Sequence, residues 1–196
     1  MPKTNAADAA HTISTDHSIP RRPRTRQAPA PGAGLIAFGG AASPDRDLGL
    51  AYAIAAPRQK TDNFRVRATE LLERATRQFP DDPDALVYLA ELYRNSGQPD
   101  RALPLYRRAL SLDAAQLTAA VGLGGILMER GQFDEAIRLW RGGLERNSGL
   151  ELVRCNLALA QWKTGDISGA RATLEKALSL SPAFAPAIQL LRQLPR

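Results

Sequence analysis

Three glycines, Gly97, Gly131 and Gly165, stand 34 residues apart, and this period is typical of a repeated helix-turn-helix unit. The same period recurs in a leucine and a small residue before each glycine, and in an alanine and a larger residue after it. These positions are Leu89-Ala90, Leu123-Gly124 and Leu157-Ala158, then Ala102, Ala136 and Ala170, and then Tyr106, Trp140 and Leu174. The pattern predicts stacked helical hairpins.

The recurring small and large residues indicate close packing of paired helices. Two antiparallel helices approach where one offers a small residue, and a large side chain opposite fills the adjoining gap. One hairpin still exposes an apolar face, so about three must stack for stability. Each glycine is expected to end a first helix in the left-handed conformation. Asp100, Asp134 and Asp166 follow near the start of each second helix, and we predict that they cap it.

The composition favours an all-α chain. The 196 residues are enough for one domain with a tail. Hydrophobic residues make up 44% of the chain, but aromatic residues only 6%, which favours packing of small residues between helices over a sheet. The net charge of +6 is spread along the chain. We therefore expect no separate basic domain.

The spaced glycines, the leucine-small pairs and the following alanines resemble the tetratricopeptide repeat family over residues 47–196. This resemblance implies an α-solenoid. The start of the chain is rich in Pro, Ala, Thr and Arg with few large apolar residues, which predicts a disordered arm over residues 1–46. The implied parts are a degenerate repeat at 47–82, repeats at 83–116, 117–150 and 151–184, and a capping helix at 185–194. In the degenerate repeat we predict a first helix over Leu48–Ala56, ended by Pro57. Pro99, Pro104 and Gly142-Gly143 depart from the family pattern and put local rigidity in doubt.

In this family the first helices of successive repeats line a concave groove that holds a partner. The resemblance therefore implies a protein-protein interaction scaffold that binds a peptide or partner protein of unknown identity. The residues mapped to this face are Val87, Glu91, Arg94, Val121, Gly125, Met128, Cys155, Leu159 and Trp162. A lining that is mixed in the first repeat and apolar in the third suits an extended peptide or a helix with apolar anchors.

Several of these residues could have a purely structural role instead of binding a partner. Trp162 and Leu159 are expected to pack beneath the capping helix in preference to meeting a ligand. Cys155 has no neighbouring histidine or second cysteine to activate it, so we expect a small buried hydrophobic residue. Glu91 and Arg94 could form a solvated face.

Catalysis, membrane insertion and nucleic-acid binding are not expected. The repeats contain no Ser/His/Asp grouping and no phosphate-binding glycine loop, so we predict that the chain is not an enzyme. The apolar stretches Gly32–Ala42 and Leu48–Ala56 are far shorter than the ~20 residues of a membrane-spanning helix. The basic run Arg21–Arg26 lacks interleaved aromatic residues, so a solubilising tail is favoured over a nucleic-acid contact.

Residues 1–26 resemble the C-terminal end of a bacterial multihaem cytochrome c domain of the kind fused to such repeats. The similar strings are Met1-Pro2-Lys3, Asp8–Thr12 and Thr15–Arg22. By this resemblance His11 and His17 are candidate axial ligands of haem iron. The chain has no Cys-x-x-Cys-His motif, so we expect no cofactor on it as given, and haem c only if such a motif lies upstream.

This second resemblance leaves two interpretations and two compartments open. Either the chain is the C-terminal fragment of an exported multihaem electron-transfer protein whose repeats dock a partner, or the repeats stand alone behind a vestigial arm. Residues 21–43 only loosely mimic a signal peptide, because their apolar run is thin and begins late. We expect a cytoplasmic location by default, and a periplasmic one if the chain belongs to such a cytochrome.

Overall fold

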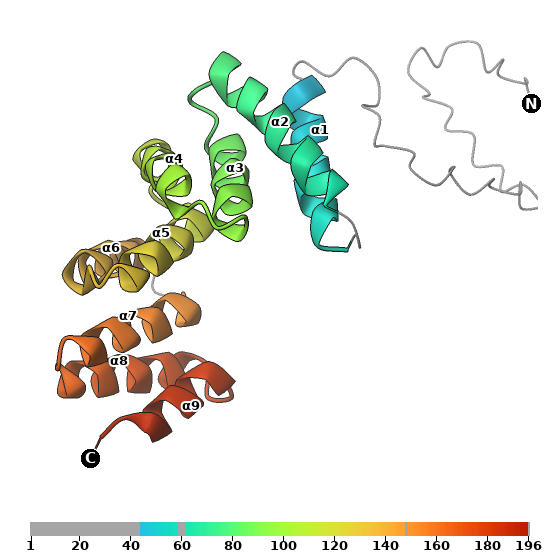
Figure 1. Cartoon of the computed structure of the whole chain (residues 1–196). Coiled ribbons are helices and arrows are strands. Elements are labelled where there is room, and N and C mark those ends of the chain that lie inside the picture. The colour runs from blue at the N-terminus through green and yellow to red at the C-terminus, as the bar shows by residue number, and fades with distance from the viewer. Residues whose placement is uncertain (1–43, 59–61, 148, 196) are drawn as a thin grey trace, which may run out of the picture. The chain divides into compact units, whose positions relative to one another are not determined.

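The computed structural model describes residues 44–58, 62–147 and 149–195, and the regular structure in these ranges is helical. The elements are α1 Pro44–Ala55, the 3₁₀ turn η2 Ala56–Arg58, α2 Asn63–Gln78, α3 Pro83–Asn95, α4 Pro99–Leu112, α5 Leu117–Glu129, α6 Phe133–Arg146, α7 Glu151–Lys163, α8 Ile167–Leu180 and α9 Ala185–Gln193. Helices pack in the pairs α1–α2, α3–α4, α5–α6 and α7–α8 (Figure 1). The first helix of each pair also contacts the first helix of the next pair. The predicted all-α solenoid is confirmed.

The three spaced glycines end α3, α5 and α7 in the left-handed conformation, as predicted. Their φ angles are 73° for Gly97, 71° for Gly131 and 88° for Gly165. After α3, the N–H of Gln98 donates to the carbonyl of Tyr93 at 2.9 Å, and the same bond recurs after α5 and α7. This is the Schellman arrangement, in which a residue with positive φ lets the chain reverse and satisfy the last carbonyl groups of the helix.

Small residues let the two helices of each hairpin approach closely. The buried residues on the second helices are Ala102, Ala136 and Ala170 near the helix start and Tyr106, Trp140 and Leu174 one turn later. On the first helices the matching small residues are Ala90, Gly124 and Ala158, which are also buried. The small and large positions found in the sequence are thus the places where paired helices meet.

The predicted aspartate caps are present at only one of the three positions. Asp166 is the N-cap of α8, and its carboxylate accepts a hydrogen bond from the backbone N–H of Gly169 at 2.9 Å. The prediction was wrong for Asp100 and Asp134, because α4 and α6 begin one residue before them and place them inside the first turn. Asp100 instead forms an ion pair with Arg130.

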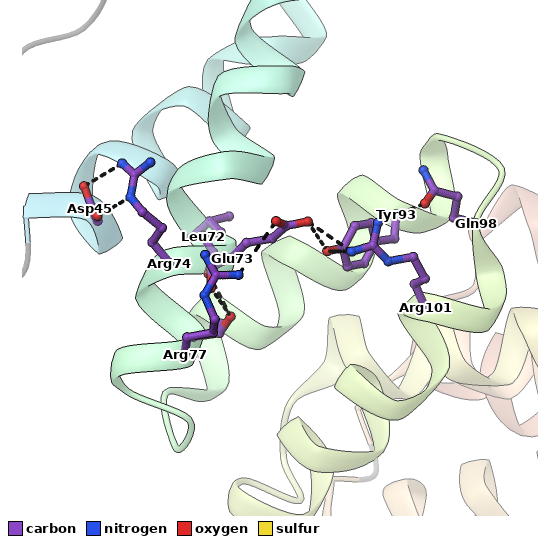
Figure 2. A network of polar contacts seen from close by, with 9 residues as sticks. Asp45, Leu72, Glu73, Arg74, Arg77, Tyr93, Gln98 and Arg101 are labelled. Carbon is purple, nitrogen blue, oxygen red and sulfur yellow. Dashed lines mark hydrogen bonds and ion pairs between the residues drawn. The ribbon is translucent and has the colours of Figure 1, made fainter.

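Helix α1 begins at Pro44, earlier than the predicted start at Leu48, and ends at Ala55. Proline is favoured at the first position of a helix, because its fixed φ suits the helix and its missing N–H is not needed there. The carboxylate of Asp45 accepts hydrogen bonds from Arg74 of α2 at 2.7 and 3.0 Å (Figure 2). This pair ties the first turn of α1 to α2.

A polar cluster joins the first two hairpins. The hydroxyl of Tyr93 on α3 donates to the carboxylate of Glu73 on α2 at 2.5 Å, and Arg101 on α4 donates to the same carboxylate at 3.1 Å (Figure 2). The guanidinium of Arg101 also lies 3.9 Å from the centre of the Tyr93 ring. Three consecutive helices are therefore linked by one tyrosine, one carboxylate and one cation.

The buried residues form two hydrophobic clusters that divide on α7. The first extends from α1 to α7 and ends on Val153, Leu157 and Ala160. The second combines Cys155 and Ala158 of α7 with buried residues of α8, α9 and the turn after α9. Helix α9 therefore covers the end of the last repeat, where a capping helix was expected.

Candidate partner-binding groove

A groove of about 560 Å³ is lined mainly by α5 and α7, with two side chains from α3. We call it the α5–α7 groove. Its lining residues are Glu91, Arg94, Leu117, Thr118, Val121, Gly122, Gly125, Met128, Glu129, Trp140, Leu152, Asn156 and Leu159. This volume falls within the range of roughly 300–1,000 Å³ that is usual for ligand sites in proteins.

Most of the lining is apolar because one face of α5 and one face of α7 point into the groove. On α5 the spacing of Leu117, Val121 and Met128 places their side chains on one side of the helix. Leu117 is 39% exposed, and Leu152 on α7 is 48% exposed. Large apolar side chains with this exposure gain free energy when a partner covers them.

Two glycines of α5 admit aromatic side chains from the second helices. A Cβ on Gly124 would fall inside the indole of Trp140, and a Cβ on Gly122 would fall inside the phenol of Tyr106. The indole N–H of Trp140 donates to the carbonyl of Ala120 at 3.1 Å, which fixes the ring. The indole is only 1% exposed, so this aromatic residue of α6 forms the floor beneath a groove otherwise lined by first helices.

Gly125 has a different role from these two glycines. A Cβ on Gly125 would meet no atom of the protein within 4 Å, so the space above this residue is open. Gly125 also lines the groove, between residues with larger side chains. The missing side chain therefore leaves a gap that faces solvent and not another part of the protein.

The α3 end of the groove is polar and internally paired. The carboxylate of Glu91 accepts a hydrogen bond from the hydroxyl of Tyr106 and another from Arg94 at 2.8 Å. Burial and then the hydrogen bond to Glu91 raise the pKa of Tyr106, so the phenol stays protonated. The hydrogen bond to Glu91 also raises the pKa of Arg94. Glu91 and Arg94 thus largely neutralise each other.

The structure brings six of the nine mapped residues together in this groove. They are Glu91, Arg94, Val121, Gly125, Met128 and Leu159. The position of Leu159 corrects the expectation that it packs beneath the capping helix. Trp162 does pack against the cluster that contains residues of α9.

Val87 and Cys155 are corrections, because both lie in the core and not in the groove. Val87 is 4% exposed and belongs to the same cluster as Tyr52 and Ala53 of α1, which packs against α3. Cys155 is 6% exposed, and burial raises the pKa of its thiol to about 11. Val87 is buried in the cluster that includes residues of α1, and Cys155 in the cluster that includes residues of α9. Neither side chain is therefore part of the groove.

Seven lining residues were not among the nine mapped positions: Leu117, Thr118, Gly122, Glu129, Trp140, Leu152 and Asn156. Trp140 lies on a second helix, and the mapping considered first helices alone. A signal for it was present in the sequence, because Trp140 and Gly124 occupy the matched large and small positions of one hairpin.

Neither a metal site nor a membrane span is found within the described ranges. No group of three or more His, Cys, Asp or Glu side chains there could hold a metal ion. No helix in the same ranges has the length and apolar character needed to cross a bilayer. The candidate haem ligands His11 and His17 lie outside the described residues.

Three family models describe parts of this chain, and each is a model of the tetratricopeptide repeat. They match residues 65–116, 94–149 and 153–184. The chain carries tetratricopeptide repeats. The matched residues include the three turn glycines and the helices that line the α5–α7 groove, so the resemblance seen in the sequence is confirmed for the repeats. The resemblance of residues 1–26 to a cytochrome is not shown by these matches.

Two curated relatives are much longer proteins. The chain is 27% identical over 126 residues to the Protein CTR9 homolog of Arabidopsis thaliana, which covers 64% of this chain and 12% of the relative. It is 32% identical over 137 residues to Cellulose synthase operon protein C of Xanthomonas axonopodis pv. citri (strain 306), and the match covers 63% of this chain and 9% of that relative. The chain therefore spans about a tenth of the length of these relatives.

Two solved structures have the same fold. MamA of Desulfovibrio magneticus RS-1 aligns with a TM-score of 0.63 at 19% identity, covering 75% of this chain and 81% of MamA. YrrB, described as a TPR protein with an unusual peptide-binding site, aligns with a TM-score of 0.60 at 20% identity, covering 78% and 92%. At these identities the likeness establishes the fold alone.

Proposed function

We propose that this chain is a protein-protein interaction scaffold that holds a peptide segment of its partner in the α5–α7 groove. One observation carries the proposal: the same groove contains two exposed leucines, Leu117 on α5 and Leu152 on α7, and an open gap above Gly125. An extended or helical segment with apolar side chains could cover these leucines and fill the gap. Tetratricopeptide repeats and the description of YrrB as a peptide-binding protein support this function.

The proposal makes Gly125 the natural position for a blocking substitution. Its Cβ would meet no protein atom within 4 Å, so Gly125→Leu starts a side chain in open space and directs it into the groove. Gly142→Leu on α6 is the matched control, because Gly142 lies outside the lining and a Cβ there makes only ordinary contact with the end of Arg146. Both substitutions remove a helix glycine, which generally stabilises a helix.

The test is selection of a random peptide library displayed on phage against the full chain, followed by fluorescence anisotropy with the enriched synthetic peptides. Excluding one apolar anchor removes about 1.5–3 kcal/mol of binding free energy, so we expect Gly125→Leu to weaken binding at least about tenfold. Gly142→Leu should bind like the unaltered chain. Failure to enrich any peptide, or equal binding by the two variants, would contradict the proposal.

A further inference from the structure

One repeat position shows what kind of side chain the groove lacks. Glu91, Gly125 and Leu159 occupy the same position in three successive repeats, and all three line the α5–α7 groove. The outer two positions carry large side chains, whereas the middle position carries none. The gap above Gly125 is therefore a slot within a row of side chains, in a groove whose lining also includes the apolar residues Met128 and Leu159.

The charges around this slot are not balanced. The charged residues of the lining are Glu91, Arg94 and Glu129, and the first two form an ion pair. Glu129 is exposed, and no ion pair to it is formed by the described part of the chain. The next residue, Arg130, pairs with Asp100. The lining therefore keeps one carboxylate that is not neutralised.

The position of Glu129 strengthens this negative potential. Glu129 is the last residue of α5, and the aligned peptide dipoles give that end of the helix a partial negative charge. A carboxylate at this end adds to the same potential, which favours a cation and disfavours a second carboxylate. Lys163, at the same repeat position on α7, is not part of the groove lining.

We propose that the groove selects a partner segment with a large apolar side chain that fills the slot above Gly125 and an adjacent lysine or arginine that faces Glu129. This inference rests on the proposed function and adds the chemistry of the partner. We infer a large apolar side chain in the partner because the lining of the groove that contains the slot is mainly apolar. Glu129 accounts for the basic residue, because opposite charge aligns a peptide and like charge rejects it.

The experiment uses the peptides enriched from the displayed library, measured against the full chain and two charge variants. Glu129→Lys reverses the carboxylate in the groove. Glu145→Lys is the control, because Glu145 is exposed on α6, outside the lining, and has no ion pair among the described residues. Each enriched peptide is also synthesised with its basic residue replaced by alanine and by glutamate.

We expect the enriched sequences to combine a large apolar residue with a lysine or arginine. Glu129→Lys should weaken their binding about tenfold or more, whereas Glu145→Lys should leave it unchanged. The peptide with glutamate should bind Glu129→Lys better than it binds the unaltered chain. This reversal is specific to a direct charge contact, since damage to the fold would weaken both peptides.

Two results would overturn the inference, and they are distinguishable. If peptides excluded by Gly125→Leu are enriched but are acidic or uncharged, or bind Glu129→Lys as tightly as the unaltered chain, the basic partner is wrong and the peptide-binding groove stands. If no peptide is enriched that Gly125→Leu excludes, the groove is not the binding site. In that case the proposed function fails together with the inference.

Discussion

The indole of Trp140 occupies the space that a Cβ on residue 124 would need, whereas the next residue, Gly125, faces open space. Two adjacent glycines of one helix therefore have opposite structural requirements. Trp140 is only 1% exposed and its N–H is hydrogen-bonded, so its ring has little freedom to move aside. The first glycine is needed for packing between α5 and α6, and the second leaves room in the groove.

Substitution of these two glycines by alanine should change stability in opposite directions. Gly124→Ala forces overlap with the ring of Trp140, and overpacking of this kind costs about 1–3 kcal/mol. Gly125→Ala should leave the free energy of unfolding unchanged or raise it by up to about 1 kcal/mol, because alanine is the better helix former. Urea denaturation monitored by circular dichroism measures both. Equal effects at the two positions would contradict the assigned packing.

Replacement of a turn glycine should be costly even where space is free. A Cβ on Gly97 would meet no atom within 4 Å, but its φ of 73° is unfavourable for residues with a side chain. We expect Gly97→Ala to lower the free energy of unfolding by about 1–2 kcal/mol. Gly142→Ala, at a helical glycine, is the control and should not destabilise the chain. Denaturant titration of both variants makes the comparison.

The N-cap of α8 should contribute more to stability than the aspartate in the first turn of α6. Asp166→Ala removes the hydrogen bond to the backbone N–H of Gly169, a change that costs about 0.5–2 kcal/mol. Asp134→Ala removes only a favourable interaction with the helix dipole, typically about 0.3–1 kcal/mol. Unfolding free energies that rank the two variants in the reverse order would refute the revised assignment.

The stability of the chain should fall at high pH partly through Tyr93. Burial and then the hydrogen bond to Glu73 raise the pKa of this phenol from 10.0 to about 12. The unfolded chain therefore ionises first, so the contribution is complete below pH 10 and is lost as the pH rises towards 12. Between these values the unfolding free energy of the unaltered chain should fall more steeply than that of Tyr93→Phe. Parallel curves would show that Tyr93 is not the group responsible.

The thiol of Cys155 should be protected in the folded chain. It is nearly inaccessible, and burial raises its pKa to about 11, so little thiolate is present at neutral pH. A disulfide reagent should react slowly with the folded chain and rapidly in denaturant. Fast reaction under native conditions would place Cys155 at the surface and restore it as a groove candidate.

The hairpins and their contacts could be predicted because they depend on local, repeated requirements. A glycine with positive φ and a small residue opposite a large one leave the same mark in every repeat, as Gly97 and the Gly124–Trp140 pair show. The repeat period brought six of the nine mapped residues into one groove for the same reason. These requirements act within one hairpin, so they can be recognised from the spacing of residues in the sequence.

The errors arose where a more distant helix decides the environment. Val87 is buried in the cluster that includes residues of α1, and Cys155 in the cluster that includes residues of α8 and α9, although both have the correct position within their own repeats. Leu159 remained in the groove because α9 packs against other residues of α7. The caps assigned to Asp100 and Asp134 failed because a shift of one residue in a helix start changes which side chain can reach the free N–H groups. Spacing within a repeat does not determine these contacts.

The division of the hydrophobic core on α7 has a consequence for how the chain opens. The buried residues of α8 and α9 belong to the second cluster, which shares no buried residue with the first. Helices α8 and α9 can therefore detach together as one local unfolding unit while α1 to α6 keep their packing. Amide hydrogen exchange in α8 and α9 should then be faster than in α3 to α6. The α3 and α5 parts of the partner-binding face would then belong to the more persistent part of the molecule, whereas α7 lies at its border with a C-terminal pair of helices that opens first.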